Sequence, residues 1–247
     1  MERISVNQIN LQHSAAAMEE LSRRLGSIDL IQEPHVREGR VVGLNKRGSR
    51  VFVGGPDARV CVCVRDGRLQ VVQVLAFCGR DMCTVSINIG EGRWLYLASV
   101  YLDSLDEGVI PESLLGLVEY TGTRNIPLLL SMDCNAHSVL WGDSSNRRGE
   151  ILEEFLDRVN LRVCNRGTVP TYVRVNAATV VDITVVNEVF DRVCAIEDWQ
   201  ADENASFSDH RYILFQVGAF VPAQEGKRNY RKTDWARSVQ ISQHLLG

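Results

Sequence analysis

The chain has 247 residues, of which 45% are hydrophobic and 23% are charged. This is the composition of an ordinary globular protein, and it excludes a disordered or collagen-like chain. The 27 basic and 31 acidic side chains give a net charge of −4. That balance excludes a general nucleic-acid coat, so any contact with DNA must come from a local site. The sequence holds no apolar run near the roughly 18 residues that cross a bilayer, so we expect no membrane partner. Its seven cysteines are an odd number spread along the chain, which argues against a disulfide framework and favours a reduced, intracellular protein.

The first hundred residues predict one helix among many strands. Residues 4–11 alternate apolar and polar side chains and predict a strand, and residues 14–25 carry apolar side chains at helical spacing behind Ser14, a suitable N-cap. The apolar run 28–32 predicts a buried strand that is stopped by a Glu-Pro pair. From 50 to 102, valine-rich runs broken by turn residues predict an antiparallel meander. Its strands are expected near 59–64, 69–76, 82–88 and 94–101.

The second half of the chain alternates helices and short strands. Pro111 predicts the start of a helix that runs through Tyr120, because proline suits the first helical turn. The run 128–131 predicts a buried strand that leads to Asp133, and residues 149–159 predict an amphipathic helix. Further strands are expected at 161–164, 171–175, 179–186, 192–199 and 211–217. Strands outnumber helices and the helices are scattered, which favours two packed sheets with helices outside over a doubly wound parallel sheet.

We expect one domain over residues 1–220 and a linker over residues 221–247. The stretch from Glu225 to Arg237 carries five basic and two acidic side chains and has little apolar content. It therefore predicts a segment that leaves the domain toward a further part of the polypeptide. The alternative is a solvated C-terminal extension with no role.

Polar residues recur just beyond the predicted strands. They are Asn10, Glu33, Tyr101, Asp133, Asn135, Asp182, Asp209 and His210. Such strand ends can converge on one rim, where the side chains are held rigidly. Each piece alone is a weak signal, because an Asp-x-Asn is usually a turn and a Ser-Asp-His is often a loop or a cap. The ordered set is far more specific.

The ordered set of polar residues resembles the exonuclease–endonuclease–phosphatase superfamily, which includes pancreatic DNase and the apurinic/apyrimidinic repair endonucleases. The resemblance covers about residues 4–218. A finer resemblance is to the endonuclease domains of non-LTR retrotransposons, close to the insect elements that insert at fixed ribosomal or telomeric sites. It rests on Asp133-Cys134-Asn135-Ala136-His137, Leu140-Trp141-Gly142, Asn146-Arg147-Arg148-Gly149, Val169-Pro170-Thr171-Tyr172 and Thr179-Val180-Val181-Asp182. The segment 228–235 resembles the bridge toward the reverse transcriptase of those elements.

This resemblance implies a fold and an activity. The fold would be a DNase-like four-layer α/β sandwich, in which two packed, mainly antiparallel sheets are flanked by helices. The activity would be that of a Mg²⁺-dependent DNA endonuclease, with Mn²⁺ able to substitute. The enzyme would nick one strand of the element's target and leave a 3′-hydroxyl that primes reverse transcription. Its partners would be double-stranded target DNA, the reverse transcriptase domain of the same polypeptide and, indirectly, the element RNA. It would work in the nucleus after synthesis in the cytoplasm.

The implied chemistry is phosphodiester hydrolysis, in which a hard divalent cation with oxygen ligands offsets the charge of the substrate. The resemblance implies Glu33 as the first metal ligand, and Asn10 as a helper through its side-chain oxygen or by holding Glu33 or the phosphate. It implies Asp209 as a second metal ligand or an outer one. Repair enzymes often carry a second acid two residues past that asparagine, where this chain has the neutral Gln12. A scheme that needs two carboxylates there does not fit.

The same resemblance assigns roles in proton transfer. Asp133 would activate the attacking water or handle the proton of the leaving group, and Asn135 would orient the phosphate and the water. His210 would donate to a phosphate oxygen or act as the base, with Asp182 fixing its tautomer. Tyr101 would place its hydroxyl on the phosphate. The sequence leaves open whether Asp133 or His210 activates the water.

The sequence says less about which residues bind DNA. Residues 172–178 predict a hairpin whose tip enters a groove, as the equivalent hairpin does in the family that the chain resembles. Arg174 and Asn176 carry suitable donors for this contact. Tyr101 and Ser104 complete the residues expected to touch DNA. The alternative is an ordinary solvent-exposed hairpin.

Three other functions are weighed against this one. The first is a cellular apurinic/apyrimidinic repair endonuclease, and the second is a phosphatase that acts on lipids or inositol phosphates. The third is a DNA-docking module with a decayed active site. Zinc is not expected, because Cys61-x-Cys63 and Cys78-x4-Cys83 lack the partners for a tetrahedral site. Alternating cysteines in a valine-rich strand are more simply core residues.

Overall fold

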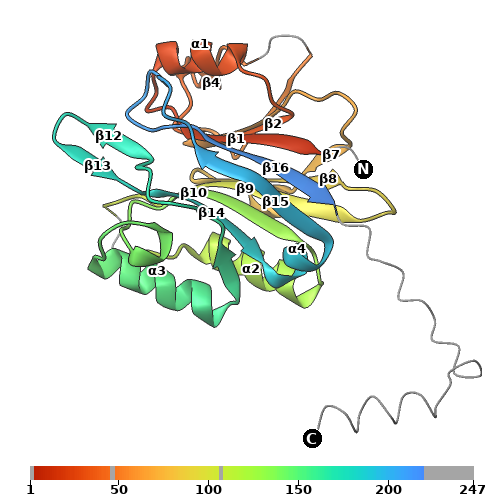
Figure 1. Ribbon diagram of the computed structural model, residues 1–247. Coiled ribbons are helices and arrows are strands. Elements are labelled where there is room, and N and C mark those ends of the chain that lie inside the picture. Colours follow the sequence, from red (N-terminus) through yellow and green to blue (C-terminus); the bar gives the residue numbers. More distant parts are fainter. Residues whose placement is uncertain (1–2, 45–47, 106–107, 220–247) are drawn as a thin grey trace, which may run out of the picture.

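Two six-stranded sheets pack face to face in the computed structural model of the chain (Figure 1). The structure describes residues 3–44, 48–105 and 108–219. The first sheet has the order β15 (Cys194–Ala201), β16 (Ile213–Ala219), β1 (Ile4–Asn10), β2 (Ile28–Gln32), β6 (Val60–Val64) and β5 (Arg50–Val53). The second has the order β11 (Leu161–Val163), β14 (Asp182–Asn187), β10 (Leu128–Asp133), β9 (Trp94–Tyr101), β8 (Met82–Asn88) and β7 (Val71–Gln73).

Most neighbouring strands are antiparallel, and each sheet contains one parallel pair. The parallel pairs are β1 with β2 and β9 with β10. Two short hairpins stand outside the large sheets: β3 (Val36–Arg37) with β4 (Arg40–Val41), and β12 (Tyr172–Arg174) with β13 (Ala177–Thr179). The β12–β13 hairpin projects from one end of the sandwich (Figure 1).

Helices cover the outer faces of both sheets. On the first sheet lies α1 (Ala15–Arg23), whose Met18 and Leu21 pack against Ile9 and Cys61. On the second lie α2 (Glu112–Thr123) and α3 (Arg147–Arg158), which Figure 1 shows together on the side away from α1. Apolar side chains of both sheets fill the space between them. This arrangement confirms the predicted four-layer sandwich.

The predicted helix boundaries follow from local capping. The Ser14 side chain accepts a hydrogen bond from the Ala17 amide at 3.1 Å, as an N-cap does. Pro111 directly precedes α2, where its fixed φ suits the start of a helix. At α3 the side chain of Asn146 accepts from the Gly149 amide at 2.7 Å, so the helix begins two residues earlier than predicted.

The predicted meander over residues 50–102 is confirmed for β7, β8 and β9 and wrong for β6. The strand β6 pairs with β2 and with the edge strand β5 in the first sheet, whereas β7, β8 and β9 form one side of the second. Valine-rich strands buried on both faces carry no signal of which sheet they join, because the choice depends on pairing with distant residues.

Two local predictions also change. The strand predicted at 69–76 is the short β7, followed by a 3₁₀ turn, η1 (Leu75–Phe77). The strand predicted from 192 begins only at Cys194, after an unpredicted helix, α4 (Glu188–Val193), which Asn187 caps by accepting from the Phe190 amide. None of the helices in the described ranges is long and apolar enough to cross a membrane. The predicted linker over residues 221–247 lies outside the described residues.

Two buried glutamines connect the sheets through the apolar core. Gln8 of β1 donates to the Ile183 carbonyl at 3.1 Å and accepts from the Thr184 hydroxyl at 2.9 Å, both on β14. Gln32 of β2 donates to the Ser99 hydroxyl at 3.0 Å and the Ser131 carbonyl at 3.2 Å, on β9 and β10. A buried amide is stable only when it is hydrogen-bonded, so these contacts fix how one sheet lies on the other.

Candidate active site

A cleft of about 460 Å³ opens at one end of the sandwich, where the strands β1, β2, β9 and β10 end. Seven of the predicted site residues line it: Asn10, Glu33, Tyr101, Ser104, Asp133, Asn135 and His210. The other lining residues are Gln12, His137, Tyr172, Ala177, Thr179 and Val181. The sequence therefore predicted about half of the lining, although these residues are spread over some two hundred positions.

Strand register explains why distant residues meet here. In the parallel β1–β2 pair Asn10 lies beside Gln32, and Glu33 directly follows Gln32. Asn10 and Glu33 therefore leave the first sheet at the same edge. In the second sheet Asp133 lies beside Tyr101 in the parallel β9–β10 pair and beside Asp182 in the antiparallel β10–β14 pair. Each sheet thus delivers its own polar residues to one end of the sandwich.

Several residues at this end adopt left-handed backbone conformations that non-glycine residues rarely occupy. The φ angles are 44° at Glu33, 46° at Asn135 and 46° at Gln12. Such residues cost free energy, about 1–3 kcal/mol in the sparsest regions, and they are found mainly where function constrains the backbone. Asn135 is held in place by a bond from its side-chain amide to the Leu102 carbonyl at 3.1 Å.

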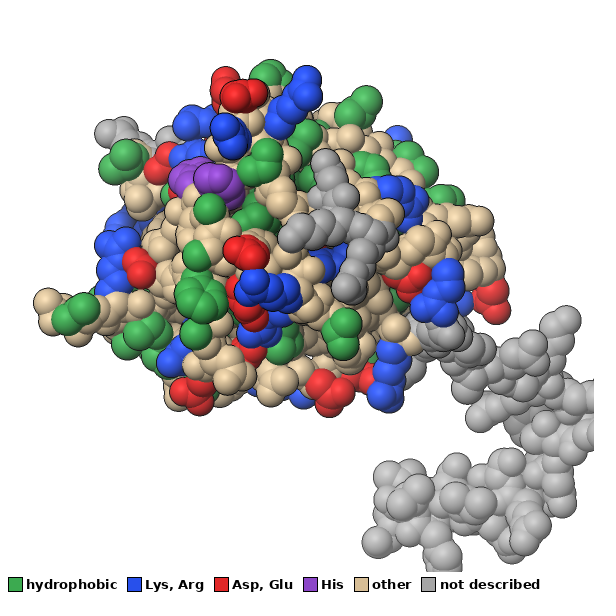
Figure 2. Space-filling model, turned by 90° about the horizontal axis from the view of Figure 1, so that it is seen from above, with side chains coloured by type: hydrophobic (Ala, Val, Ile, Leu, Met, Phe, Trp, Pro, Cys, Tyr) green, Lys and Arg blue, Asp and Glu red, His purple; other side chains and the backbone are tan. Residues whose placement is uncertain are grey.

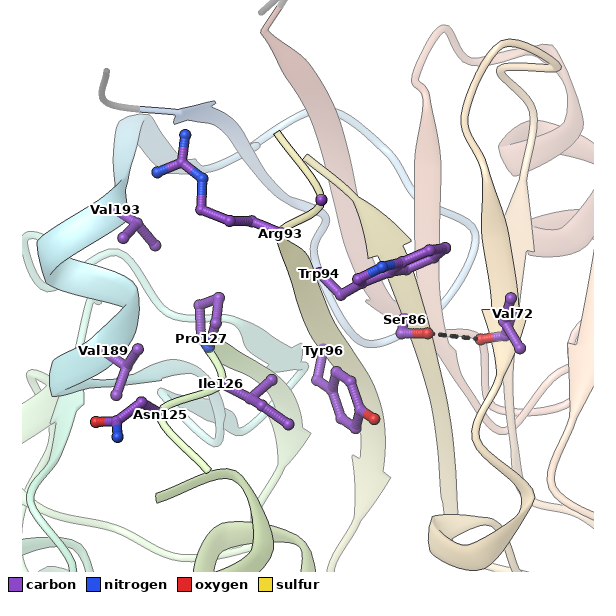
Figure 3. Close-up of a pocket in the computed structure, with 11 residues that line it drawn as sticks. Val72, Ser86, Arg93, Trp94, Tyr96, Asn125, Ile126, Pro127, Val189 and Val193 are labelled. Carbon is purple, nitrogen blue, oxygen red and sulfur yellow. Dashed lines mark hydrogen bonds between the residues drawn. The ribbon is translucent and has the colours of Figure 1, made fainter. Parts of the chain in front are cut away.

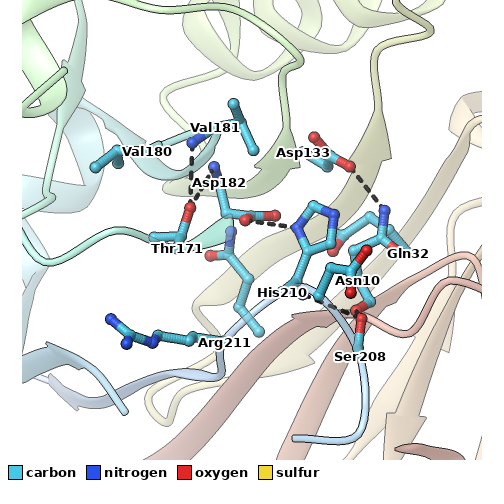
Figure 4. Close-up of polar contacts among 12 residues, drawn as sticks. Asn10, Gln32, Asp133, Thr171, Val180, Val181, Asp182, Ser208, His210 and Arg211 are labelled. Carbon is cyan, nitrogen blue, oxygen red and sulfur yellow. Dashed lines mark hydrogen bonds and ion pairs between the residues drawn. The ribbon is translucent and has the colours of Figure 1, made fainter. Parts of the chain in front are cut away.

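A buried histidine–carboxylate pair forms one wall of the cleft (Figure 4). The Nδ1 of His210 lies 2.8 Å from a carboxylate oxygen of Asp182, and the two side chains are 6% and 2% exposed. The Thr171 hydroxyl accepts from the amides of Val181 and Asp182 at 3.1 and 3.0 Å, which fixes the strand that carries the carboxylate. The ring of Tyr172 packs edge-on against the imidazole, with 4.9 Å between ring centres.

The charges around His210 favour its protonated form. Burial alone lowers the pKa of the imidazole, but the Asp182 carboxylate opposes this through its charge and its hydrogen bond. The charges of Asp133 and Glu33 act in the same direction, and the pKa rises to about 9. At neutral pH His210 is therefore a cation whose Nδ1 is already used, which leaves Nε2 for a group in the cleft.

Asp133 is a buried carboxylate with an amide partner. Its side chain accepts from the Nδ2 of Asn10 at 2.7 Å, across the gap between the two sheets. Burial and the nearby charge of Asp182 raise the pKa of Asp133 to about 7, against the lowering effects of His210 and Asn10. A carboxyl group with a pKa near neutrality can both release and take up a proton at physiological pH.

Tyr101 stands half-buried on the rim of the cleft. The guanidinium of Arg59 lies 4.5 Å from its ring centre and is itself paired with Asp81 and Asp103. Burial, together with the charges of Glu33 and Asp133, raises the pKa of the phenol to about 12. The hydroxyl is therefore a neutral hydrogen-bond donor throughout the physiological range.

The donor set at the cleft fits a hard divalent cation. Carboxylate, amide and phenol oxygens from Asn10, Glu33, Tyr101, Asp133 and Asn135 face one space, and oxygen is the ligand that such ions prefer. Within the described residues, the carboxylate of Glu33 has one basic group within 4.0 Å, His13, whose Nε2 is 3.7 Å away. Asn10 is more occupied, because its oxygen accepts from the Gln12 amide at 2.8 Å and its nitrogen donates to Asp133.

A second group of potential ligand atoms lies deeper. One ligand atom from each of Asp133, Asp182 and His210 lies within 4.8 Å of the others. Here the pair between His210 Nδ1 and Asp182 already uses a proton, and a charged imidazole repels a cation. One oxygen of Asp182 has no partner within the described part of the chain. The group is better suited to proton transfer than to metal binding.

The structure does not bring Asp209 into the cleft. Its carboxylate accepts from Arg174 of the β12–β13 hairpin and, at 3.3 Å, from the side chain of Gln12. With Arg174 and the exposed Asn176 it lines a separate hollow beside the hairpin. The hydrogen bond from Arg174, the largest contribution, lowers the pKa of Asp209. Asp209 therefore anchors the hairpin, and the predicted metal role finds no support in its position.

Sequence reasoning did not assign roles to several residues that shape the site. Gln12 holds both the backbone and the side chain of Asp209. Thr171 holds the strand before Asp182, and Tyr172 packs on the imidazole of His210. Thr171 and Tyr172 belong to the motif Val169-Pro170-Thr171-Tyr172, which therefore carried the signal, but only the fold shows what they touch.

A second hollow, of about 490 Å³, lies at the opposite end of the same strands (Figure 3). Trp94 and Tyr96 of β9, Pro127 before β10, and Val189 and Val193 of α4 line it. These walls are mainly apolar, and no carboxylate or histidine is among the described residues that line it. Chemistry at a phosphate needs groups of that kind, so this hollow is not the active site.

The charge pattern of the surface agrees with the net charge of the chain. Seen from the side of α1, basic and acidic side chains are interspersed over the described surface (Figure 2). A protein with such a surface has little general attraction for a polyanion. Contact with nucleic acid would have to be concentrated at the cleft and its hairpin.

Comparisons with known proteins agree with this geometry. Residues 95–214 match the family model described as endonuclease-reverse transcriptase. The endonuclease domain of TRAS1, a telomere-specific non-LTR retrotransposon, is 27% identical over 87% of this chain and 98% of its own, with a TM-score of 0.72. No curated protein sequence matches the chain.

More distant structures share the fold. The AP endonuclease LMAP from Leishmania major is 12% identical over 87% of each chain, with a TM-score of 0.66. The 3′-5′ exonuclease from Neisseria meningitidis is 15% identical over 87% of this chain and 99% of its own, with a TM-score of 0.61. In sequence and fold the chain is therefore similar to the endonuclease domains of non-LTR retrotransposons, and the more distant nucleases share its fold.

Proposed function

We propose that the protein is a Mg²⁺-dependent DNA endonuclease that nicks one strand of a retrotransposon target site and leaves a 3′-hydroxyl. One observation carries the proposal. Asp133 and Asp182 of the second sheet face Asn10 and Glu33 of the first, and His210, from the loop before β16 of the first sheet, pairs with Asp182. This places a cationic N–H donor, a carboxyl group of near-neutral pKa and a metal-binding carboxylate around one space, as phosphodiester hydrolysis requires.

In this proposal His210 binds the phosphate and Asp133 handles the proton of the water. Because Nδ1 is paired with Asp182, the imidazolium presents Nε2 to a phosphate oxygen and stabilises the negative charge that develops there. A protonated imidazole cannot accept a proton from water, so the base is Asp133, which Asn10 holds in place at 2.7 Å. Asn135 and the neutral phenol of Tyr101 complete the hydrogen bonds to the phosphate.

A divalent cation, for which Mg²⁺ is the proposed ion, would be held by Glu33 and supplies positive charge against the phosphate when bound. Glu33 suits this role because it lines the cleft and, within the described residues, the basic group within 4.0 Å of it is a single histidine. Its left-handed backbone turns the chain directly after β2, so the side chain leaves the edge of the sheet. Asn10 supports Asp133 instead, which narrows the predicted ligand set.

We propose that the β12–β13 hairpin and the cleft rim together bind duplex DNA. Arg174 and Asn176 lie on the exposed hairpin, and Tyr101 and Ser104 lie on the rim. The hairpin is joined to the wall of the cleft that His210 and Asp182 form, because Tyr172 makes a β-bridge with His210. The nick would prime a reverse transcriptase domain of the same polypeptide, with the element RNA as its template, in the nucleus.

The proposal is tested by nicking of supercoiled plasmid. We expect the protein to convert it to the open-circular form with Mg²⁺ and not with EDTA. His210→Ala and Asp133→Asn should abolish nicking, whereas Asp157→Asn, the same chemical change on the exposed face of α3, should not. Equal plasmid loss by the His210→Ala variant would refute the assignment of the site.

A second experiment separates this function from repair. A duplex with one abasic site and an intact duplex of target sequence are compared at equal concentration. Cleavage of the intact duplex supports a target nuclease. A strong preference for the abasic duplex would favour a repair enzyme, and unaltered DNA binding without cleavage would favour a docking module.

A further inference from the structure

A second histidine–carboxylate pair lies in the loop between β10 and α3. The Nδ1 of His137 is 2.9 Å from a carboxylate oxygen of Asp143, and the two side chains are 29% and 13% exposed. The imidazole lines the same cleft as His210. The chemistry described above uses neither residue of this pair.

The backbone of His137 is clamped to the first turn of α3. Its amide donates to the side chain of Asn146 at 3.2 Å, and its carbonyl accepts from the Asn146 amide at 3.0 Å. Gly149 permits this approach, because a Cβ at that position would lie 1.8 Å from the His137 carbonyl oxygen. The loop is thus built to hold the imidazole at one place on the cleft.

Asp143 connects this histidine to the catalytic wall. The oxygen that meets His137 also accepts from the Val180 amide at 2.8 Å, two residues before Asp182. The other oxygen accepts from the Ser144 amide at 2.7 Å. Burial raises the pKa of Asp143, but these hydrogen bonds outweigh it and lower the pKa, so the carboxylate is ionised. An ionised partner on Nδ1 fixes the orientation of the ring and leaves Nε2 for a ligand, to which it donates when the ring carries both protons.

Few of the side chains that line the cleft are basic. Among the described residues that line it there is neither lysine nor arginine. The amide nitrogens of Asn10, Gln12 and Asn135 already donate to protein oxygens. His137 and His210 are the basic side chains among the described residues that line the cleft. A nucleic acid that enters the cleft carries a phosphate on either side of the scissile one, and His210 can serve only one phosphate.

We propose that His137 binds a DNA backbone phosphate adjacent to the scissile phosphate through Nε2, with Asp143 as its positioning residue. The inference rests on the proposed nuclease function and deepens it. It assigns to this loop a role in setting which phosphodiester bond lies under His210. Phosphate contacts of this kind fix the register of a protein on DNA without reading its sequence.

The test combines a protein variant with a change in the substrate. A short duplex carries a neutral methylphosphonate in place of one phosphate, scanned over the positions that flank the nick. Wild-type protein should lose about tenfold in kcat/KM at one flanking position, which corresponds to about 1.4 kcal/mol. His137→Gln should lose about as much on the unmodified duplex, mainly through KM, and lose nothing more at that position.

Controls keep the outcome decisive. Asp143→Asn should show a partial loss at the same position, and thermal unfolding of both variants excludes a folding defect as the cause. The inference would be overturned if His137→Gln left KM unchanged. It would also be overturned if methylphosphonate at every position, including the flanking one, lowered kcat/KM of the variant as much as that of the wild type. Failure of the wild-type protein to nick with Mg²⁺, while His210→Ala behaves identically, would instead overturn the proposed function. In that case the same methylphosphonate scan is read by equilibrium DNA binding, where loss of the flanking contact still distinguishes His137→Gln from wild type.

Discussion

Replacement of Asp182 by asparagine tests the electrostatic basis of the site. The change keeps the shape of the side chain and its acceptor oxygen but removes the charge that faces His210 Nδ1 at 2.8 Å. Burial lowers the pKa of His210, and the variant lacks the charge that mainly counteracts this effect. We expect the pKa of His210 to fall from about 9, because the charges of Asp133 and Glu33 that remain are the smaller contributions.

The magnitude follows from the two pKa values. A histidine whose pKa is raised from 6.5 to about 9 on folding contributes about 3 kcal/mol to the free energy of unfolding. Because the folded-state pKa is the higher one, this stability is fully present below pH 6.5 and is lost as the pH rises through 9. Both side chains are almost fully buried, so solvent screening is small.

The assay is urea unfolding at about pH 6 and about pH 10, together with NMR titration of the imidazole. Wild type should lose about 3 kcal/mol more than Asp182→Asn between these two conditions. Nicking by the variant at neutral pH should fall by about 10²-fold or more, because the phosphate loses its cationic donor. Parallel stability profiles, or a wild-type His210 that titrates near its unperturbed value, would refute the reasoning.

Three further predictions concern neighbouring features. Asp133→Asn should abolish nicking. Because burial and the charge of Asp182 raise the pKa of Asp133 to about 7, the free energy of unfolding of the wild type should fall as the pH rises from 3.8 through 7. Urea unfolding of the variant should not show this decline. Gly149→Ala should lower the free energy of unfolding by about 1–3 kcal/mol, since its Cβ would meet the His137 carbonyl, whereas Gly122→Ala on the exposed part of α2 should not destabilise. Removal of divalent cations with EDTA should stop nicking without changing the far-ultraviolet circular dichroism, and addition of Mg²⁺ or Mn²⁺ should restore it; loss of folded structure in EDTA would contradict a purely catalytic role of the ion.

Residues at strand ends were the most predictable part of the site. Asn10, Asp133 and Asp182 follow or end apolar runs, and parallel or antiparallel register then brings such ends to a common edge. The sequence could not predict that Arg174 pairs with Asp209, because that contact joins two loops thirty-five residues apart. Polar pairs of this kind depend on loop geometry, which local propensity does not determine.

The fold shows the same division between local and distant information. The helix behind Ser14 was predictable because its cap and its apolar spacing are both local. The partition of the valine-rich strands between two sheets was not, since the sheet that β6 or β8 joins is set by its distant pairing partners. The short α4 was missed because Asn187 caps a helix of only six residues, too short for a clear periodic pattern.

The two buried glutamines link catalytic turnover to the packing of the core. One sheet carries Asn10 and Glu33, and the other carries Asp133, Asp182 and Tyr101. The distances between these groups therefore depend on how one sheet is aligned on the other. Apolar side chains between sheets can repack with small lateral shifts, whereas such a shift would lengthen the hydrogen bonds that Gln8 and Gln32 make to the facing sheet. Turnover in this enzyme is therefore sensitive to shear between its layers, and substitutions deep in the sandwich can slow the reaction while leaving every residue of the cleft unchanged.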